Sequence, residues 1–413
     1  MPQYDVAVIG GGPAGLSAAS SAAKAGARVL LIEREDSLGG ILKQCIHDGF
    51  GLTRYHEKLS GPEYAYKEIE GLEGLGIKCL TSSFVTKIDK TDEGFRLHIV
   101  NAEGVSTELS KTLILATGCR ERTSRQVFIQ GTNPAGVMTA GQAQNYINRL
   151  GLMPIKKAVI LGSGDIGLIM ARRITLEGGE VEGVYEVKST PSGLARNIAQ
   201  CLTDFNIPLH LSHTVTEVFG TDRLEAVTIA KVDEKMRPIP GTERHVECDA
   251  LILSVGLIPE NELAKKLGIS LERTTKGPIV DQNFMTDQPG VFSCGNAMHV
   301  NDLADYVSES GEIAGKAAAT YAKQIPAAYS RIGHDEHIAY VVPQRIDHAR
   351  LKNPIIFYFR SSAVYQNMTL VVRSAGKEIL RRKYLSLRPP EMERISLTVS
   401  EECDVEFALE EQK

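Results

Sequence analysis

Short, almost wholly apolar runs recur along the first half of the chain. Residues Tyr4–Ile9, Arg28–Ile32 and Lys157–Leu161 are dominated by Val, Ile, Leu and Ala, as is typical of strands buried on both faces of a parallel sheet. Segments rich in small or periodic apolar residues, from Leu16 to Lys24 and from about Leu168 to Leu176, predict helices between them. Strands that alternate with helices predict an α/β fold.

The pattern changes near Pro326, where an alanine-rich helix predicted over about 311–323 comes to an end. Beyond it, apolar and polar residues alternate, which predicts strands with one buried face. The predicted strands are Ile355–Phe359, Met368–Arg373, Glu378–Tyr384, Ile395–Val399 and Val405–Leu409. We therefore expect residues 326–413 to form a small β-rich domain that resembles a sandwich.

A glycine-rich turn follows the first strand with the spacing GxGxxG, at Gly10, Gly12 and Gly15. The first glycine permits a tight turn, the second lets a pyrophosphate approach the backbone, and the third lets the helix pack on the strand. The next strand ends on Glu33, whose carboxylate can accept hydrogen bonds from ribose hydroxyls. We predict a dinucleotide site here, which also includes Pro13, Ala14 and Arg34.

The same pattern returns at Gly162, Gly164 and Gly167, and the strand after its helix ends on Glu186. Asp165 and Ile166 complete this second predicted site. An acid at the strand end accepts from a free ribose 2′-hydroxyl and repels a 2′-phosphate, so we predict NAD(H) rather than NADP(H). The positive charge of the neighbouring Lys188 makes the predicted preference for NAD(H) weaker. The alternative is a relic unit that no longer binds a nucleotide.

Composition and charge argue against several other classes of protein. A net charge of -5 over 413 residues argues against a nucleic-acid-binding protein. We see neither a leader nor an apolar run long enough to span a bilayer, so we expect a cytoplasmic protein with no direct membrane span. The seven cysteines form no CxxC pair, which argues against a metal or iron–sulfur site, and we predict none.

The order of the motifs resembles that of the pyridine nucleotide–disulfide oxidoreductase superfamily over roughly residues 1–325. The carriers of this resemblance are the two glycine motifs, Ala116-Thr117-Gly118, Val255-Gly256 and the late Gly295-Asn296. It implies two Rossmann-like domains, with the NAD(H)-binding domain inserted into the FAD-binding domain. We place the FAD domain at 1–122 and 257–325 and the NAD(H) domain at 123–256, ahead of the β-rich domain at 326–413.

The resemblance also implies which further residues bind FAD. Gly39 and Gly40 fit the loop beneath the flavin, and Val85 fits the position whose backbone holds adenine. Asn296 stands where the family usually has Asp, and its amide oxygen can also accept from the ribitol chain. A helix that begins near Asp302 would point its N-terminus at the flavin. The full implied set adds Ala116, Thr117, Gly118, Gly256, Gly295, Asp302 and Leu303.

One cysteine and one histidine follow the Gly39-Gly40 turn, and they are the candidate catalytic residues. Disulfide reductases of this superfamily carry a cysteine pair, but no second cysteine lies near Cys45 in the sequence, and Cys201 and Cys248 lie far apart. We therefore reject dithiol chemistry. Cys45 and His47 either act as a thiolate–imidazole pair or, the interpretation we favour, shape the flavin pocket.

Three stretches, 39–51, 134–141 and 294–302, resemble bacterial FAD-dependent oxidoreductases that accompany an anaerobic-type glycerol-3-phosphate dehydrogenase and a small third protein. A looser likeness extends to subunits of sarcosine oxidase, opine oxidase, dye-linked proline dehydrogenase and hydrogen cyanide synthase. The resemblance implies a hetero-oligomer in which a partner flavoprotein oxidises the substrate and this chain handles NAD(H). The β-rich domain would then contact the partner.

Other interpretations of the function stay open. A self-contained NADH oxidase or reductase is the first, with Cys45 or His47 near the electron acceptor. The second is a structural subunit with degenerate cofactor sites, although both glycine motifs and both strand-end glutamates are intact. The charged cluster of Arg120, Glu121, Arg122 and Arg125 would bind an anionic substrate, face a partner or form a solvated loop.

Overall fold

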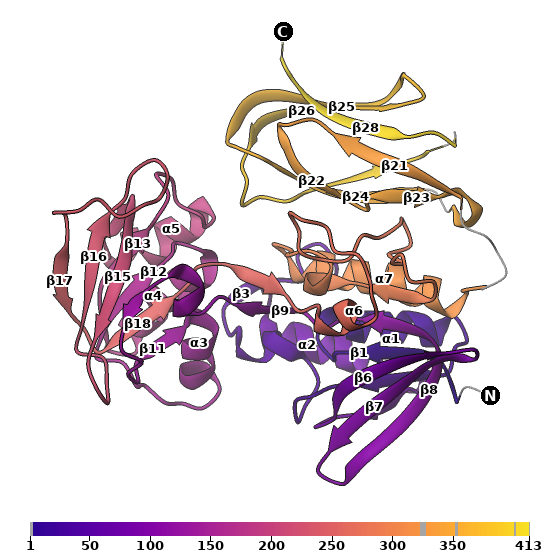
Figure 1. The fold of residues 1–413 in the computed structure, drawn as a ribbon, viewed down its shortest axis with the longest axis horizontal. Coiled ribbons are helices and arrows are strands. Elements are labelled where there is room, and N and C mark those ends of the chain that lie inside the picture. Colours follow the sequence, from indigo (N-terminus) through magenta and orange to yellow (C-terminus); the bar gives the residue numbers. More distant parts are fainter. Residues whose placement is uncertain (1–2, 323–327, 352–353, 400–401, 413) are drawn as a thin grey trace. The chain divides into compact units, whose positions relative to one another are not determined.

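The computed structural model describes residues 3–322, 328–351, 354–399 and 402–412. The chain divides into two compact units, one formed by 1–119 and 259–413 and the other by 120–258 (Figure 1). The C-terminal strands, set apart by their sequence pattern, are thus compact with the first unit. The chain crosses between the units in two short strands that pair with each other, β9 (Cys119–Glu121) and β19 (Leu257–Pro259).

A seven-stranded sheet forms the centre of the first unit, in the order β5-β2-β1-β8-β7-β6 with β20 beside β8. Its apolar central strands pair in parallel, whereas β6, β7 and β8 form an antiparallel meander. The strands are β1 (Tyr4–Ile9), β2 (Val29–Ile32), β5 (Lys78–Leu80), β6 (Phe84–Thr91), β7 (Gly94–Asn101), β8 (Gly104–Leu115) and β20 (Val291–Ser293). The sheet brings the ends of β1, β8 and β20 side by side.

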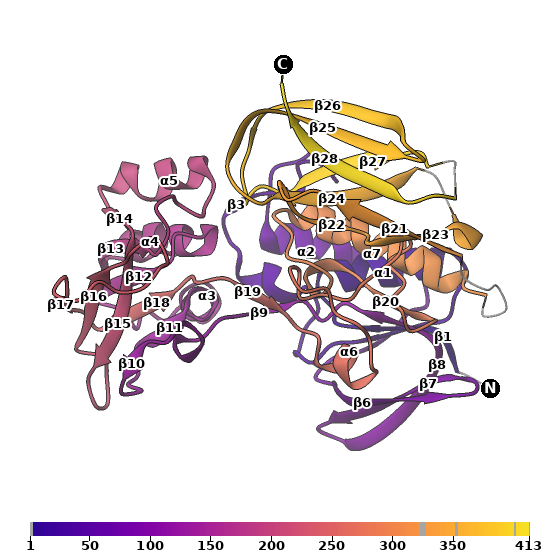
Figure 2. The same ribbon diagram turned by 45° about the horizontal axis from the view of Figure 1, so that its top comes forward.

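Two helices from the two chain segments of this unit pack closely together, α1 (Pro13–Lys24) and α7 (Ala304–Ala319) (Figure 2). A Cβ atom on Gly311 would lie 2.1 Å from the Ala14 carbonyl oxygen, so only glycine allows this approach. The helix predicted over about 311–323 by its alanine content begins seven residues earlier, close to the start near Asp302 that the resemblance implies, and ends at Ala319. The other helices of the unit are α2 (Gly61–Glu70) and the short α6 (Glu262–Lys266), and β3 (Asp48–Phe50) pairs with β4 (Leu59–Ser60).

The second unit repeats the pattern of parallel strands and helices. Its five-stranded sheet has the order β11-β18-β12-β13-β14, and a four-stranded sheet has the order β10-β15-β16-β17. The strands are β10 (Gln130–Gly131), β11 (Val137–Thr139), β12 (Lys157–Leu161), β13 (Glu180–Glu186), β14 (Leu209–Leu211), β15 (His213–Phe219), β16 (Ala226–Lys231), β17 (Arg244–Glu247) and β18 (Ala250–Leu253). The helices are α3 (Ala140–Asn148), α4 (Asp165–Leu176) and α5 (Ala195–Cys201).

The C-terminal strands form two sheets around a shared apolar core, one of order β23-β21-β28-β25-β26 and the other of order β22-β24-β27. They are β21 (Tyr329–His334), β22 (Ile338–Val342), β23 (Arg345–Asp347), β24 (Ile355–Ser361), β25 (Tyr365–Ser374), β26 (Lys377–Leu387), β27 (Glu393–Leu397) and β28 (Val405–Glu411). Phe357 and Phe359 face this shared core, while Tyr358 between them packs with residues of α7. One sheet therefore covers α7 with its outer face.

Within the part of the chain that the structure describes, no helix is both long and apolar enough to cross a bilayer. The same residues contain no group of three or more His, Cys, Asp or Glu side chains arranged to hold a metal ion.

Candidate functional site

The first glycine motif forms the turn between β1 and α1. Gly10 has a φ of +108°, and a Cβ there would lie 2.3 Å from the Ala116 carbonyl oxygen. A Cβ on Gly15 would lie 1.8 Å from the Gly10 carbonyl oxygen. Gly12 differs, because a Cβ there would meet only the Gly40 Cα, at 3.9 Å. Packing within the protein thus requires Gly10 and Gly15, whereas Gly12 leaves open space that fits the approach of a phosphate.

The start of α1 is suited to an anion. Gly12 is the N-cap residue and, as a glycine, has no side chain to cap the first turn, which also holds no acidic residue. Pro13 is the first helical residue. The N–H groups of such a first turn have no partner within the helix, and the helix dipole favours a negative charge beside them. This second observation also fits a bound pyrophosphate.

Glu33 closes the glycine turn from the end of β2. Its side chain is buried; one carboxylate oxygen accepts from the Gly11 backbone nitrogen at 2.6 Å and the other from the Glu35 nitrogen at 2.8 Å. The Glu33 carbonyl oxygen accepts from the Ser83 nitrogen at 2.9 Å, which brings the segment of Val85 next to the strand end. The Glu33 carboxylate, which we expected to bind ribose, is thus hydrogen-bonded to the glycine turn and to the loop after β2.

The other segments predicted to bind FAD meet around the same turn. A Cβ on Gly40 would lie 2.9 Å from the Gly12 Cα, and one on Gly295 would lie 2.7 Å from the Ala14 Cβ. Gly39 donates its N–H to the Gly11 carbonyl oxygen at 2.8 Å. The segment Ala116-Thr117-Gly118 directly follows β8 and therefore begins beside Gly10. Arg34 is exposed.

Asn296 points its amide at two neighbours. Its Oδ1 accepts from the Asn301 backbone nitrogen at 3.0 Å, and its Nδ2 lies 3.5 Å from the Cys119 Sγ. The amide oxygen that we expected to accept from the ribitol chain is therefore already bound. Because the Asn301 N–H fixes the orientation of the amide, this side chain offers N–H groups on its other side.

Asp302 and Leu303 lie just before α7. The Asp302 carboxylate pairs with Arg360 of β24 and accepts from the Met392 nitrogen at 2.5 Å. The Leu303 residue caps α7 through its carbonyl oxygen, which accepts from the Val307 nitrogen at 3.3 Å. The sequence resemblance implied that Asp302 binds the cofactor. In the structure, the Asp302 carboxylate instead binds residues of the C-terminal region.

Sequence reasoning missed Asp305, in the first turn of α7. Its buried carboxylate accepts from three backbone nitrogens of one loop, those of Gly51 at 3.2 Å, Thr53 at 3.1 Å and Arg54 at 2.7 Å. Asp305 thereby fixes the loop that continues from the Cys45 segment. An acidic residue in the first turn of a predicted helix is a recognisable signal in the sequence. That signal does not indicate which loop the carboxylate binds.

Cys45 and His47 each turn to a different neighbour. The Cys45 thiol donates to the Ile41 carbonyl oxygen at 3.4 Å, and burial raises its pKa to about 12. The His47 ring stacks on Phe50 at 5.1 Å, and its Nδ1 lies 3.2 Å from the Asp48 carbonyl oxygen. A thiol of such high pKa stays protonated at neutral pH and is a poor nucleophile. This supports the pocket-shaping interpretation.

The second glycine motif packs on Ser254, which follows β18. A Cβ on Gly162 would lie 2.1 Å from the Ser254 carbonyl oxygen, and one on Gly167 would lie 2.6 Å from the Ser254 Cβ. A Cβ on Gly164 would lie 3.1 Å from the Ser254 Oγ. The Gly167 nitrogen donates to this hydroxyl at 3.1 Å. Ser254 is thus a structural counterpart of Ala116 that the sequence analysis did not single out.

Glu186 closes this second turn as Glu33 closes the first. One of its buried carboxylate oxygens accepts from the Ser163 nitrogen at 3.0 Å and from the Ser163 hydroxyl at 2.6 Å. The other accepts from the Lys188 nitrogen at 3.1 Å. The Ser163 Oγ in turn accepts from the Ser192 nitrogen at 2.8 Å. A single serine therefore links the glycine turn, the acid and the loop after β13.

Asp165 also holds that loop. Its Oδ1 accepts from the Leu194 nitrogen at 2.9 Å and from the Asn197 Nδ2 at 2.7 Å. The side chain predicted to contact the nucleotide thus connects the start of α4 to α5. Gly256 lies two residues beyond Ser254, and its carbonyl oxygen accepts from the Arg122 nitrogen at 3.1 Å.

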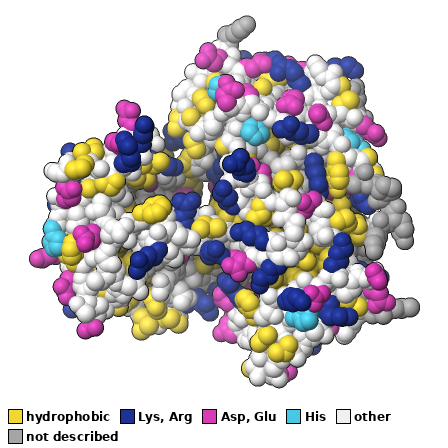
Figure 3. All heavy atoms as spheres, viewed as in Figure 1, with side chains coloured by type: hydrophobic (Ala, Val, Ile, Leu, Met, Phe, Trp, Pro, Cys, Tyr) yellow, Lys and Arg dark blue, Asp and Glu magenta, His cyan; other side chains and the backbone are white. Residues whose placement is uncertain are grey.

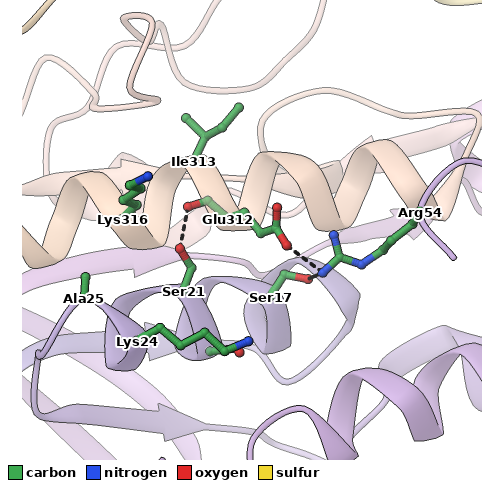
Figure 4. A pocket seen from close by; sticks show the side chains of 9 residues that line it. Ser17, Ser21, Lys24, Ala25, Arg54, Glu312, Ile313 and Lys316 are labelled. Carbon is green, nitrogen blue, oxygen red and sulfur yellow. Dashed lines mark hydrogen bonds and ion pairs between the residues drawn. The ribbon is translucent and has the colours of Figure 1, made fainter. Parts of the chain in front are cut away.

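A hollow of about 520 Å³ lies beside α1, α7 and Arg54 (Figure 4). The Ser17 hydroxyl donates to the Glu68 carboxylate at 2.6 Å and the Ser21 hydroxyl to the Glu312 carbonyl oxygen at 2.9 Å. Arg54 pairs with both glutamates, at 2.6 and 2.8 Å. Its serines and Arg54 are hydrogen-bonded or ion-paired to neighbouring groups, while Lys24 and Lys316 also line the hollow.

Charges of both signs are interspersed on the face of the molecule seen in Figure 3. Arg122 and Arg125 are exposed, whereas the Glu121 carboxylate accepts from the Gly141 nitrogen at 2.9 Å. Of this charged cluster, Glu121 thus has a structural role at the start of α3.

Comparison with known proteins agrees with this geometry. The profile of the family described as pyridine nucleotide-disulphide oxidoreductase matches residues 4–331. The HcnB subunit of hydrogen cyanide synthase from Pseudomonas aeruginosa is 27% identical over 76% of this chain and 69% of its own length. An opine oxidase subunit of Agrobacterium tumefaciens is 25% identical over 76% and 64%. The alpha subunit of sarcosine oxidase from a Corynebacterium species is 28% identical over 62% of this chain, but only 26% of its own length.

The fold has a counterpart among solved structures. Thioredoxin reductase from T. acidophilum superposes with a TM-score of 0.64 at 22% identity, covering 77% of this chain and 98% of that one. The predicted α/β fold with Rossmann-like sheets and a C-terminal β-rich region is thereby confirmed.

Proposed function

The chain belongs to the pyridine nucleotide-disulphide oxidoreductase family, and we propose that it passes electrons between NAD(H), FAD and a separate substrate-oxidising flavoprotein. Membership of the family makes the chain an oxidoreductase and implies FAD and a nicotinamide cofactor. The observation that carries the proposal is the pair of equivalent turns. Each has glycines set against the end of a central strand and a buried glutamate bound to the turn's backbone.

FAD would bind at the first turn. The open space at Gly12 and the uncapped start of α1 suit its pyrophosphate, and Glu33 has carboxylate lone pairs left for a ribose. Gly40, Gly295 and Asn296 lie around the same turn and would line the approach to the flavin. When bound, the flavin supplies the redox chemistry, and these residues hold and orient it.

NAD(H) would bind at the second turn, in preference to NADP(H). Glu186 is buried and anchored by Ser163 and the Lys188 backbone. A fixed carboxylate there accepts from a free 2′-hydroxyl and repels a 2′-phosphate. Asp165 supports the same preference indirectly, because it holds the loop beside Glu186 in place.

A partner flavoprotein would supply or receive the electrons. Cys45 stands alone after the Gly39-Gly40 turn, so the chain lacks the cysteine pair of a disulfide reductase at that position. Three relatives are named as subunits of larger enzymes. We propose a cytoplasmic complex that also includes a small third protein. Its partner flavoprotein would oxidise glycerol 3-phosphate or a similar small metabolite and would face the C-terminal strands of this chain.

Anaerobic stopped-flow spectroscopy of the purified chain tests the two cofactor sites. NADH should bleach the flavin absorbance rapidly, and NADPH should do so more slowly. A bound flavin that neither nucleotide reduces would contradict the second site. A colourless chain that binds no added FAD would contradict the first and would favour a structural subunit.

A self-contained NADH oxidase or reductase is the second candidate, favoured by the presence of two complete glycine turns in one chain. It predicts steady turnover of NADH with oxygen or a dye in the absence of any partner. The first proposal predicts a single fast reduction of the flavin and slow turnover until the partner is added.

A further inference from the structure

The segment from Gly295 to α7 lies beneath the C-terminal strands. Its His299 is fully buried, with its ring centroid 5.3 Å from that of Tyr358 in β24 and 6.0 Å from that of Tyr340 in β22. Both strands belong to the three-stranded sheet that covers α7. The segment that would lie along the flavin is therefore held between the two parts of the first unit.

Arg360 of β24 connects this sheet to the segment. Its Nη2 donates to the Val300 carbonyl oxygen at 3.1 Å and pairs with the Asp302 carboxylate. Its Nε donates to the Tyr340 hydroxyl at 2.8 Å, and its Nη1 donates to the Pro389 carbonyl oxygen at 3.1 Å. A planar guanidinium with its donors bound on several sides is a rigid connection.

The connection continues to the residue that would contact FAD. Val300 and Asp302 flank Asn301, whose backbone nitrogen donates to the Asn296 Oδ1 at 3.0 Å. Asn301 also donates from its Nδ2 to the His299 carbonyl oxygen at 2.8 Å. Arg360 binds the residues on both sides of Asn301 and so fixes the position of Asn301. The Asn301 N–H in turn determines where the Asn296 amide points.

A second ion pair joins the same sheet to α7 but bypasses the segment. Arg394 of β27 donates to the Glu309 carboxylate at 2.6 and 2.8 Å, and the Tyr358 hydroxyl donates to the same carboxylate at 2.6 Å. Glu309 lies in the middle part of α7, beyond its first turn. This pair attaches the strands to the helix without contacting residues 296–302.

We propose that Arg360 is a positioning residue of the FAD site, acting through Val300, Asp302 and Asn301 on Asn296. The proposal rests on FAD binding at the first glycine turn, as proposed above. It assigns to the C-terminal strands a part in tuning the cofactor besides any contact with a partner.

The test compares Arg360→Lys with Arg394→Lys in the full chain. Lysine keeps the charge but cannot bind several acceptors in one plane. Arg360→Lys should weaken FAD binding about tenfold, as expected for disturbed hydrogen bonds to a charged group, and should shift the midpoint potential of the bound flavin. Arg394→Lys should leave the FAD affinity and the midpoint potential unchanged, although both variants lower the melting temperature.

Equal effects of the two variants on FAD affinity and potential would overturn the proposal, because Arg360 would then only attach the strands. Should Arg360→Lys not fold, Tyr340→Phe and Tyr358→Phe give the same comparison, since the first removes a hydroxyl that binds Arg360 and the second removes one that binds Glu309. Only Tyr340→Phe should shift the flavin potential. A wild-type chain that binds no FAD would instead contradict the proposed function.

Discussion

The Glu186 carboxylate accepts hydrogen bonds from both the backbone nitrogen and the hydroxyl of Ser163, at 3.0 and 2.6 Å. The first glycine turn has only the equivalent backbone bond, from Gly11 to Glu33. The second turn is thus bound to its acid at two points, and through the Ser163 hydroxyl also to Ser192.

We expect Ser163→Ala to weaken NADH binding while FAD binding stays unchanged. The substitution removes the hydroxyl that links Glu186 to the loop after β13, and loss of a hydrogen bond to a charged group corresponds to about tenfold in affinity. The concentration dependence of flavin reduction by NADH measures the effect. An unchanged dependence would mean that Glu186 needs only the Ser163 backbone.

Alanine at Gly12 and at Gly10 should have different consequences. Gly12→Ala places its methyl group in open space, so the melting temperature should hold while the flavin content of the purified chain falls. Gly10→Ala collides with the Ala116 carbonyl oxygen at a φ of +108°, which should destabilise the fold by about 2 kcal/mol or more. Thermal unfolding and flavin absorbance separate the two effects. A Gly12→Ala chain with full flavin content would contradict a phosphate at that position.

The Cys45 thiol should react slowly at neutral pH. With a pKa of about 12, its thiol is protonated over the neutral range, and the thiolate fraction grows only as the pH rises toward that value. Alkylation by iodoacetamide should therefore be slow at pH 7, with the exposed Cys403 as the internal reference. Cys45→Ala should leave the rate of flavin reduction by NADH unchanged. Fast alkylation at neutral pH would support the thiolate–imidazole interpretation instead.

Asp281 should make stability depend on pH. Its side chain is fully buried, and burial raises its pKa to about 6 although its Oδ1 accepts from the Asn283 and Met285 nitrogens. The folded chain therefore keeps this proton where the unfolded chain has lost it. Between about pH 4 and 6, the free energy of unfolding should fall by about 3 kcal/mol relative to Asp281→Asn. Parallel pH profiles of the two chains in denaturant titrations would contradict this.

The elements that form the two glycine turns were predictable because their signals are local. The apolar run of β1 begins and ends at the predicted residues, and the spacing of the glycines marks each turn. The start of α1 was placed three residues late, because Pro13 was assigned to the turn although proline suits a first helical position. Strands β21 to β23 were not among the predicted strands.

The contacts that fix the candidate site were not predictable in the same way. Asp305 binds Gly51 across 254 residues of sequence, and Arg360 meets Asp302 across 58. Such pairs leave no periodicity in the chain, because only the fold brings the two segments together. The family's motif suggested a role for Asp302 at the cofactor, but no motif indicated that an arginine from the C-terminal strands takes up its carboxylate.

The interlocking of α1 with α7 has a consequence for synthesis of the protein on the ribosome. The small residues of α1 leave the exit tunnel early, but Gly311 and Gly315, which press against Ala14 and Ala18, are translated only after the whole second unit. The second unit can thus fold first as the nascent chain grows, while α1 still lacks its packing partner α7. Ribosome-stalled chains that end before residue 304 should therefore protect the second unit from protease and leave the first unit open to cleavage.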